Sequence, residues 1–161
     1  MLNVGILTIS DKGSQGQRDD KSGQEIKNSL APLNGHFARY EIIPDDLDVI
    51  QQKLMEWADN GNVDIIITTG GTGLSQRDVT PEATLSVADK TVPGLAEAMR
   101  AGTLDKTPRA MLSRATAGVR RKCLIVNLPG SPKAVGECLA VILPVIPHAI
   151  EIIKGVITDH S

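Results

Sequence analysis

Three glycines within four positions form the most unusual local pattern in this sequence of 161 residues: Gly70, Gly71 and Gly73. A backbone without side chains can approach an anion closely and direct successive N–H groups at phosphate oxygens. The loop is not a Walker A motif, because no Gly-Lys-Ser/Thr follows, and Gln76 occupies the place of the third glycine in a dinucleotide fingerprint. The segment from Thr69 to Ser75 is therefore predicted to be a phosphate cradle, with a tight strand-to-helix turn as the alternative.

Two aspartates flank this loop in the sequence and predict a metal-assisted reaction. Asp45 ends an apolar run, and Asp78 follows the glycine loop within the same excursion of the chain. Carboxylates beside a phosphate cradle repel the phosphates unless a cation intervenes, so the pair is predicted to hold Mg²⁺ together with the substrate. Mn²⁺ accepts the same oxygens. The alternatives are a turn or N-cap role for Asp45 and an Asx turn ahead of Thr80 for Asp78, and such structural roles are expected for Asp46 and Asp48.

Two further polar loops follow apolar runs, at Ser10 to Gly16 and at Asn127 to Lys133. Parallel strands present their carboxyl ends at one edge of a sheet, so the three loops are predicted to form one pocket. Thr80 and Ser131 each precede a proline, a pattern typical of helix caps, and a helix N-terminus also attracts anions. The basic residues in or near these loops are Lys12, Lys21, Arg77 and Lys133.

The elements that must position these loops are predicted from hydrophobic patterning. Three runs are nearly continuously apolar, Val4 to Ile9, Val63 to Thr69 and Cys123 to Asn127, as expected for strands that are buried on both faces. Helical patterns alternate with them. The sequence therefore predicts an α/β fold: a single three-layer domain over residues 1–161, with a mostly parallel open sheet and helices on both faces.

Helix boundaries are predicted from capping residues. Ser22 and Glu25 are spaced as a capping box, and that first helix should end near Pro32. Asp48 is the expected N-cap of the next helix, which should stop at Asn60-Gly61. Further helices should begin at Thr80, at Ser131 and near Ile146.

The segment from 93 to 121 is the least clear. Apolar spacing suggests a helix that ends at Gly102, whereas Arg114 to Arg121 fits either a helix or an edge strand. Apolar positions around Leu95 to Leu112 are candidates for an oligomer contact.

Composition excludes several classes of protein. The net charge is −2, with only three aromatic residues and no dense Lys/Arg run, which argues against nucleic-acid binding. Apolar runs such as Cys123 to Val126 are too short to span a bilayer, and no signal peptide is evident, so no membrane partner and a cytoplasmic location are expected. Cys123 and Cys138 are expected in the core. The histidines, His36, His148 and His160, do not cluster at zinc-ligand spacing.

Six segments of the chain resemble the molybdopterin adenylyltransferases, the Mog, MoaB and gephyrin G-domain family of molybdenum cofactor biosynthesis. The segments are Ile9-Ser10-Asp11, Ile43-Pro44-Asp45, Thr68 to Gly73, Arg77 to Glu82, Pro93-Gly94 and Leu128 to Lys133. In order and spacing they cover nearly the whole chain, so the resemblance is more specific than any single loop.

The resemblance implies a molybdopterin-binding-like fold, usually a homotrimer, that transfers AMP from ATP to the terminal phosphate of molybdopterin and releases pyrophosphate. It implies that Asp45 and Asp78 are catalytic, and it leaves open whether a molybdenum-insertion protein docks on the chain. The residues it assigns to nucleotide and pterin binding are Ser10, Asp11, Thr69, Gly70, Gly71, Thr72, Gly73, Ser75, Glu82, Pro129, Gly130, Ser131 and Lys133.

Two other functions fit the same loops. One is a pterin-binding or carrier protein without adenylation, because a fold does not determine an activity. The other is a nucleotide pyrophosphatase resembling the related domain of the competence-damage protein, in which water would attack a dinucleotide at the same carboxylates.

Overall fold

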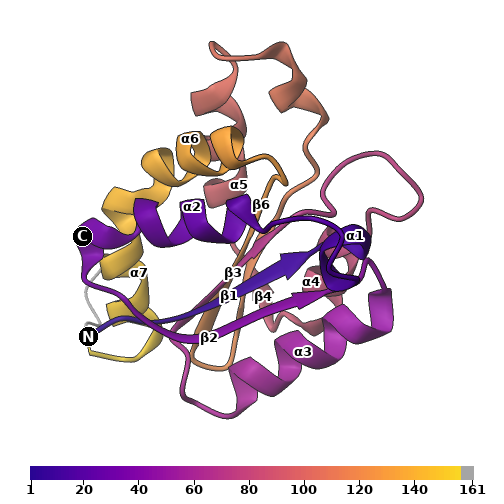
Figure 1. The fold of residues 1–161 in the computed structure, drawn as a ribbon. Coiled ribbons are helices and arrows are strands. Elements are labelled where there is room, and N and C mark those ends of the chain that lie inside the picture. Colours follow the sequence, from indigo (N-terminus) through magenta and orange to yellow (C-terminus); the bar gives the residue numbers. More distant parts are fainter. Residues whose placement is uncertain (157–161) are drawn as a thin grey trace.

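The computed structural model describes residues 1–156, so His160 lies outside the described residues. Strands and helices alternate along the chain (Figure 1). They are β1 (Asn3–Ile9), α1 (Asp11–Ser14), α2 (Lys21–Ser29), η1 (Ala31–Leu33), β2 (His36–Ile43), α3 (Leu47–Asp59), β3 (Ile65–Thr69), α4 (Thr80–Val87), β4 (Lys90–Thr91), α5 (Pro93–Thr103), η2 (Pro108–Leu112), β5 (Ala117–Arg120), β6 (Cys123–Leu128), α6 (Pro132–Ile142), η3 (Leu143–Val145) and α7 (Ile146–Ile153).

The strands form one mixed sheet in the order β2-β1-β3-β6-β5-β4. The pairs β1/β2, β1/β3 and β3/β6 are parallel, and β5 runs antiparallel to both of its neighbours. The predicted α/β fold with a mostly parallel sheet is confirmed, and the ambiguous segment from 114 to 121 contains strand β5. Strand β2 was not predicted, because it lies at the sheet edge and its residues are exposed or half-buried except for Ile43.

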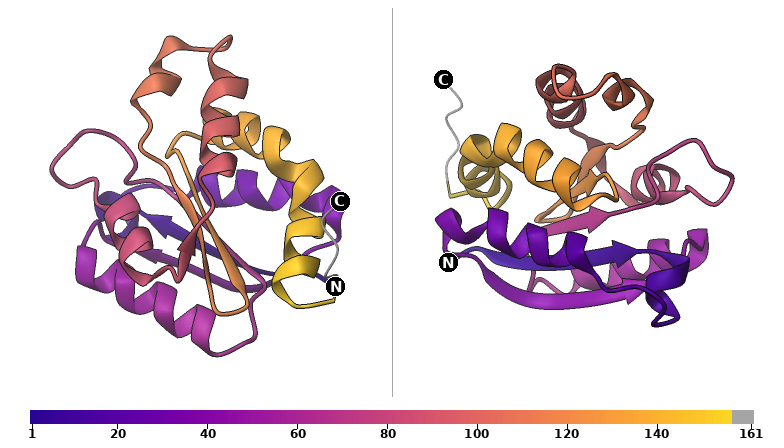
Figure 2. Two further views of the ribbon diagram at one scale, coloured as in Figure 1. Left: turned by 180° about the vertical axis from the view of Figure 1, so that it is seen from behind. Right: turned by 45° about the horizontal axis from the view of Figure 1, so that its top comes forward.

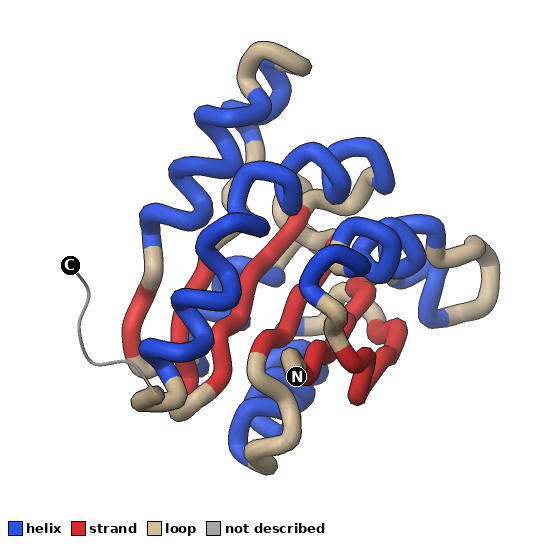
Figure 3. The backbone as a smooth tube through the Cα atoms, turned by 90° about the vertical axis from the view of Figure 1, so that its left-hand side faces the viewer, coloured by secondary structure: helices blue, strands red, loops and turns tan. Residues whose placement is uncertain are grey.

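Helices cover both faces of the sheet (Figures 2 and 3). On one face α2, α5, α6 and α7 enclose a core cluster with Ile6 and Ile67 at its centre. On the other face α3 and α4 pack over a second cluster that includes Leu7 and Ile66. Successive residues of one strand thus point into opposite clusters, which is why these strands are apolar on both faces.

Two predicted caps are wrong because a neighbouring aspartate takes the role. The N-cap of α2 is Asp20, whose carboxylate accepts a hydrogen bond from the Gly23 N–H at 2.9 Å. Ser22 lies inside the helix, where its hydroxyl donates to the Gly130 carbonyl. The N-cap of α3 is Asp46, which accepts from the Val49 N–H at 3.1 Å, and Asp48 occupies the first turn.

The Thr80-Pro81 and Ser131-Pro132 pairs were both predicted to begin with a helix N-cap, but only one of them does. Ser131 caps α6 as predicted, accepting from the Ala134 N–H at 3.2 Å. Thr80 is the first residue of α4, not its cap, and its hydroxyl donates to the Gly70 carbonyl at 3.0 Å. Its side chain therefore supports the glycine loop.

The helical run Pro132–Ile153, formed by α6, η3 and α7, spans 22 residues and is long and apolar enough to cross a membrane by length and composition alone. Val135, Leu139 and Ile146 on this run belong to the core cluster against the sheet. Pro144 and Pro147 fall in the region where α6 gives way to α7. The apolar side chains of the Pro132–Ile153 run therefore help to cover one face of the sheet.

Neither cysteine is expected to react in the native protein. Cys123 is fully buried and Cys138 is 7% exposed. Burial raises the pKa of the Cys123 thiol to about 12 and that of Cys138 to about 11. Since the thiolate is the reactive form, iodoacetamide at pH 8 should label neither cysteine in the native protein and both in denaturant. Mass spectrometry of the two samples checks this, and stoichiometric native labelling would contradict the buried placement.

Candidate active site

A cavity of about 690 Å³ opens at the carboxyl ends of the parallel strands. Loops after β1, β3 and β6 all contribute to its wall, so the prediction that these three loops form one pocket is confirmed. The end of β2 adds Asp45, and the chain leading into α2 adds a fourth wall. The predicted site residues that line the cavity are Ser10, Asp45, Thr69, Gly70, Gly71, Asp78, Gly130 and Ser131.

The other predicted site residues lie around this cavity without lining it. Asp11 begins α1, and Lys133 lies in the first turn of α6. Glu82 lies on α4 and pairs with Arg114, with the Arg114 Nη1 at 2.6 Å from a carboxylate oxygen. Pro129 lines a second cavity, described below. Thr72, Gly73 and Ser75 belong to the loop that carries the chain from the glycines to Asp78.

The first two glycines of the loop are required by the backbone. Gly70 has φ +100°, and a Cβ there would lie 2.3 Å from the Ile9 carbonyl oxygen. Gly71 has φ +71°, and its Cβ would lie 2.2 Å from the Thr80 hydroxyl. The Gly70 N–H already donates to the Leu128 carbonyl at 3.1 Å, so not every N–H of the loop is free for a ligand. The tight-turn interpretation thus explains these glycines, while both residues still face the cavity.

Buried hydroxyl and amide groups form hydrogen bonds at the ends of β3 and β6, next to the glycine loop. The Asn127 side-chain amide donates to the hydroxyls of Thr68 at 3.1 Å and Thr84 at 2.9 Å, and all three residues are fully buried. The Thr69 hydroxyl donates to the Pro129 carbonyl at 2.6 Å, which ties β3 to the loop after β6. Satisfied polar groups in a core hold one geometry, because breaking any of them leaves a buried group unpaired.

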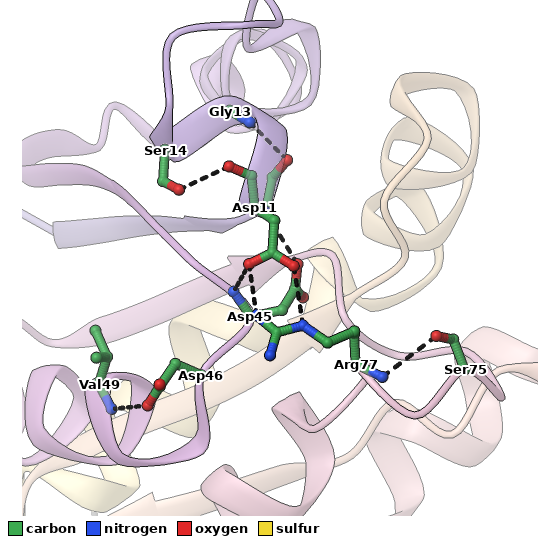
Figure 4. Close-up of polar contacts among 9 residues, drawn as sticks. Asp11, Gly13, Ser14, Asp45, Asp46, Val49, Ser75 and Arg77 are labelled. Atoms are coloured by element: carbon green, nitrogen blue, oxygen red, sulfur yellow. Dashed lines mark hydrogen bonds and ion pairs between the residues drawn. The ribbon is translucent and has the colours of Figure 1, made fainter.

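Asp45 and Asp11 bind each other's backbone (Figure 4). The Asp11 N–H donates to an Asp45 carboxylate oxygen and the Asp45 N–H to an Asp11 carboxylate oxygen, both at 3.0 Å. Arg77 donates through Nε and Nη2 to the two Asp11 oxygens at 3.0 and 2.8 Å. Asp11 is therefore a structural partner that joins three loops, and Arg77 is neutralised by it.

The two carboxylates of this pair have opposite pKa shifts. Hydrogen bonds from Arg77 lower the pKa of Asp11. Burial raises the pKa of Asp45, and the negative charges of Asp11 and Asp78 raise it further. Asp45 is thus a partly desolvated carboxylate beside other negative charge, which is an environment that a cation would stabilise.

Asp78 closes its own loop. A carboxylate oxygen accepts from the Ser75 N–H at 3.0 Å, and the Asp78 N–H donates back to the Ser75 carbonyl at 3.0 Å. In an Asx turn the Asp78 side chain would bind a backbone N–H that follows it, near Thr80. Its partner is instead the Ser75 N–H, which precedes it, so Asp78 does not form the predicted Asx turn. A Cβ at Gly73 would lie 2.9 Å from this carboxylate, so glycine there leaves room for Asp78.

Asp45 and Asp78 are suited to a hard divalent cation. Both line the cavity, and each uses one carboxylate oxygen in the hydrogen bonds above. Within residues 1–156 no group of three or more His, Cys, Asp or Glu side chains is placed to hold a metal. Mg²⁺ commonly binds through one or two carboxylates together with substrate phosphates, so two carboxylates that line one cavity beside the glycine loop fit that ion.

Sequence reasoning missed one wall of the cavity, which consists of Arg18, Asp19 and Asp20 together with Lys21 and Ser22. Of these residues, the sequence predicts only Lys21 to lie near the site, and it predicts Ser22 as a helix cap. Asp20 is anchored by hydrogen bonds from the Thr8 hydroxyl at 2.7 Å and from the Tyr40 hydroxyl. The polar run between the first strand and the first long helix was the available signal, because any residue there follows a strand's carboxyl end.

A second cavity of about 300 Å³ lies between α5, η2 and α6 and shares Ser131 with the first. Apolar side chains that include Met99 and Cys138 provide most of its surface, and polar residues that include Arg100, Ser113 and Glu137 also line it. A mostly apolar surface with polar groups at particular points is typical of sites for small organic molecules.

Comparisons with known proteins converge. Residues 5–148 match the family model described as a probable molybdopterin binding domain. The chain is 44% identical over 156 residues to the molybdopterin adenylyltransferase of Helicobacter pylori strain J99, covering 96% of this chain and 89% of that protein. It is 42% identical over 140 residues to the enzyme of that name from Escherichia coli K12, covering 86% and 72%.

Among solved structures, the molybdopterin biosynthesis enzyme MoaB from Thermus thermophilus superposes with a TM-score of 0.91 at 52% identity. The match covers 96% of this chain and 98% of that chain. The residues matched by the family model include every residue that lines the larger cavity.

Proposed function

The chain belongs to the family of probable molybdopterin-binding domains, and from that premise we propose that it acts in molybdenum cofactor biosynthesis as a molybdopterin adenylyltransferase. In this reaction an oxygen of the terminal phosphate of molybdopterin attacks the α-phosphorus of ATP. A new P–O bond forms, the bond to the β-phosphate breaks, and pyrophosphate leaves. The observation that carries the proposal is that Asp45 and Asp78 line one cavity beside the glycine loop.

The nucleophile of this reaction needs alignment more than activation. A phosphate monoester has a second pKa near 6 and is mostly doubly ionised at pH 7, so no general base is required. The glycine loop and the start of α6 surround the cavity with backbone and with the Ser131 hydroxyl, and a helix N-terminus favours an anion. These groups hold the reacting phosphates together, which removes much of the entropic barrier.

Asp45 and Asp78 are the residues that would hold Mg²⁺. When bound, this ion neutralises the negative charge that develops on the leaving pyrophosphate. The two carboxylates would hold the cation from different loops, and Arg77 occupies both carboxylate oxygens of Asp11 and lowers its pKa. The basic side chains of Arg18 and Lys21 on the fourth wall balance further phosphate charge.

The second cavity extends the proposal to the pterin. It adjoins the first at Ser131, its volume suits a fused ring, and its walls are largely apolar. We infer that the ring system of molybdopterin occupies it while the terminal phosphate reaches towards Asp45 and Asp78. The nucleotide then occupies the larger cavity.

The experiment that tests the proposal is mass spectrometry of the protein incubated with molybdopterin, ATP and Mg²⁺, beside a control without pterin. Adenylylated molybdopterin and pyrophosphate, formed only in the complete mixture, are the expected products. Bound but unmodified pterin would identify a carrier instead. Cleavage of ATP or a dinucleotide without pterin would identify the pyrophosphatase.

Assembly and location remain predictions. We propose a homotrimer with contacts in the apolar segment from Leu95 to Leu112, in which Met111 and Leu112 are exposed. Light scattering on the purified protein measures this mass directly. A cytoplasmic location and docking of a molybdenum-insertion protein are proposed on the same family grounds.

A further inference from the structure

Arg114 binds the loop that carries Asp78 at three points and the helix that follows it, α4, at a fourth. It precedes β5, far in sequence from that loop, and its backbone N–H donates to the Thr72 carbonyl at 2.9 Å. Its guanidinium donates through Nε to the Gly73 carbonyl at 2.8 Å and through Nη2 to the Asp78 carbonyl at 2.7 Å. Nη1 lies 2.6 Å from a Glu82 carboxylate oxygen on α4.

These contacts reach both ends of an exposed loop. Residues 74–77 are exposed to solvent, and Leu74 is 68% exposed, so packing contributes little to their placement. Within the loop, the paired hydrogen bonds between Ser75 and Asp78 define a local turn, and the exposed Arg77 side chain joins that turn to Asp11. The Arg114 side chain joins the carbonyls on either side of the turn, Gly73 and Asp78, to the body of the protein.

The segment that carries Arg114 is itself held on both sides. Arg100 on α5 donates through Nη1 to the Ser113 carbonyl at 3.3 Å and to the Ala115 carbonyl at 2.8 Å. Ala115 is buried, and β5 begins at Ala117. Arg114 therefore extends from a rigid base, which is what a side chain needs if it is to position another residue.

We propose that Arg114 is a positioning residue that places the Asp78 carboxylate in the cavity by fixing the Gly73 and Asp78 carbonyls. Its effect on turnover rests on the proposed function, whereas its effect on the loop does not. Arg114 does not line either cavity, so it acts through Asp78 and not on the substrate. A lysine cannot replace it, because one ammonium group lacks the planar fork that reaches two carbonyls and a carboxylate together.

The test compares Arg114→Lys with Arg120→Lys. Arg120 lies at the other end of β5 and makes a similar set of bonds, to both Asp59 oxygens at 2.9 and 3.0 Å and to the Val87 carbonyl at 2.8 Å. It lines neither cavity. The two substitutions should lower the melting temperature by similar amounts. Differences between the variants in hydrogen exchange or turnover therefore report on the loop and not on general stability.

Arg114→Lys is expected to accelerate hydrogen exchange of the amides in residues 72–79 about tenfold, while Arg120→Lys leaves them unchanged. In the adenylylation assay, Arg114→Lys should reduce kcat by about 10- to 100-fold, because a carboxylate displaced by about 1 Å costs roughly that much. It should also raise the Mg²⁺ concentration needed for half-maximal rate. Arg114→Gln serves as a second variant with the same expectations.

Unchanged exchange at residues 72–79 in both Arg114 variants would overturn the proposal, as would equal acceleration in Arg120→Lys. Faster exchange with wild-type turnover and Mg²⁺ dependence would overturn the link to Asp78. If the wild-type protein forms no adenylylated product, the proposed function fails. In that case the exchange comparison still decides whether Arg114 fixes the loop.

Discussion

Asp78→Asn is expected to lower the rate of adenylyl transfer by about 10²- to 10³-fold, the usual effect of removing one group that stabilises transition-state charge. Asparagine has nearly the same shape, and its side-chain oxygen can still accept the hydrogen bond from the Ser75 N–H. The loop should therefore keep its conformation while the cavity loses one negative charge. Pterin binding should persist, because the pterin is inferred to occupy the second cavity.

The control for this prediction is Asp46→Asn. Asp46 is adjacent to Asp45 in sequence but does not line the cavity, and it caps α3 through the Val49 N–H. Asparagine is an equally good N-cap, so this variant removes a nearby charge without affecting the helix. Single-turnover rates and pterin titrations of both variants give the measurement. An Asp78→Asn protein with full turnover, or one that no longer binds pterin, would contradict the metal-holding role.

Gly70→Ala is expected to lower the free energy of unfolding by about 3 kcal/mol or more. The residue has φ +100°, which an L-residue adopts only under strain, and its Cβ would lie 2.3 Å from the Ile9 carbonyl oxygen. The clash involves backbone, which cannot move aside like the end of a side chain, so the overpacking cost adds to the strain. Because Ile9 belongs to β1, the damage should reach the sheet.

Gly61→Ala is a matched control, because Gly61 has φ +76° but no atom lies within 4 Å of its Cβ position. It carries the conformational penalty alone, about 1 kcal/mol. Urea unfolding curves of the two variants separate the penalty from the clash. Equal losses in both variants would mean that the contact between Gly70 and Ile9 is not tight.

Part of the site could be predicted because its signals are local. The glycine loop and the Ser131 cap follow continuously apolar runs, Asp78 lies in the same excursion of the chain as the glycine loop, and the ends of parallel strands share one edge of a sheet. Asp45 could be proposed but not placed, because the strand that it follows, β2, is an edge strand with only its last residue buried. Arg18 and Asp20 lie in a loop whose composition differs little from ordinary surface.

The amino-acid sequence alone indicates the α/β class and the central strands, because burial on two faces restricts their positions to apolar residues. It also indicates the glycines of the loop beside the cavity, because their backbone conformation excludes most other residues. The partners of the charged groups, in contrast, depend on how the chain packs. Arg77 binds Asp11, Arg114 binds the Asp78 loop, and Asp20 displaces Ser22 as a helix cap. Such bonds join residues that are far apart in the chain, or involve one of several adjacent polar side chains. No fixed spacing in the sequence predicts which partners will bind. The sequence therefore identifies the groups that can perform the chemistry, while the packing of the loops determines which of them face the cavity.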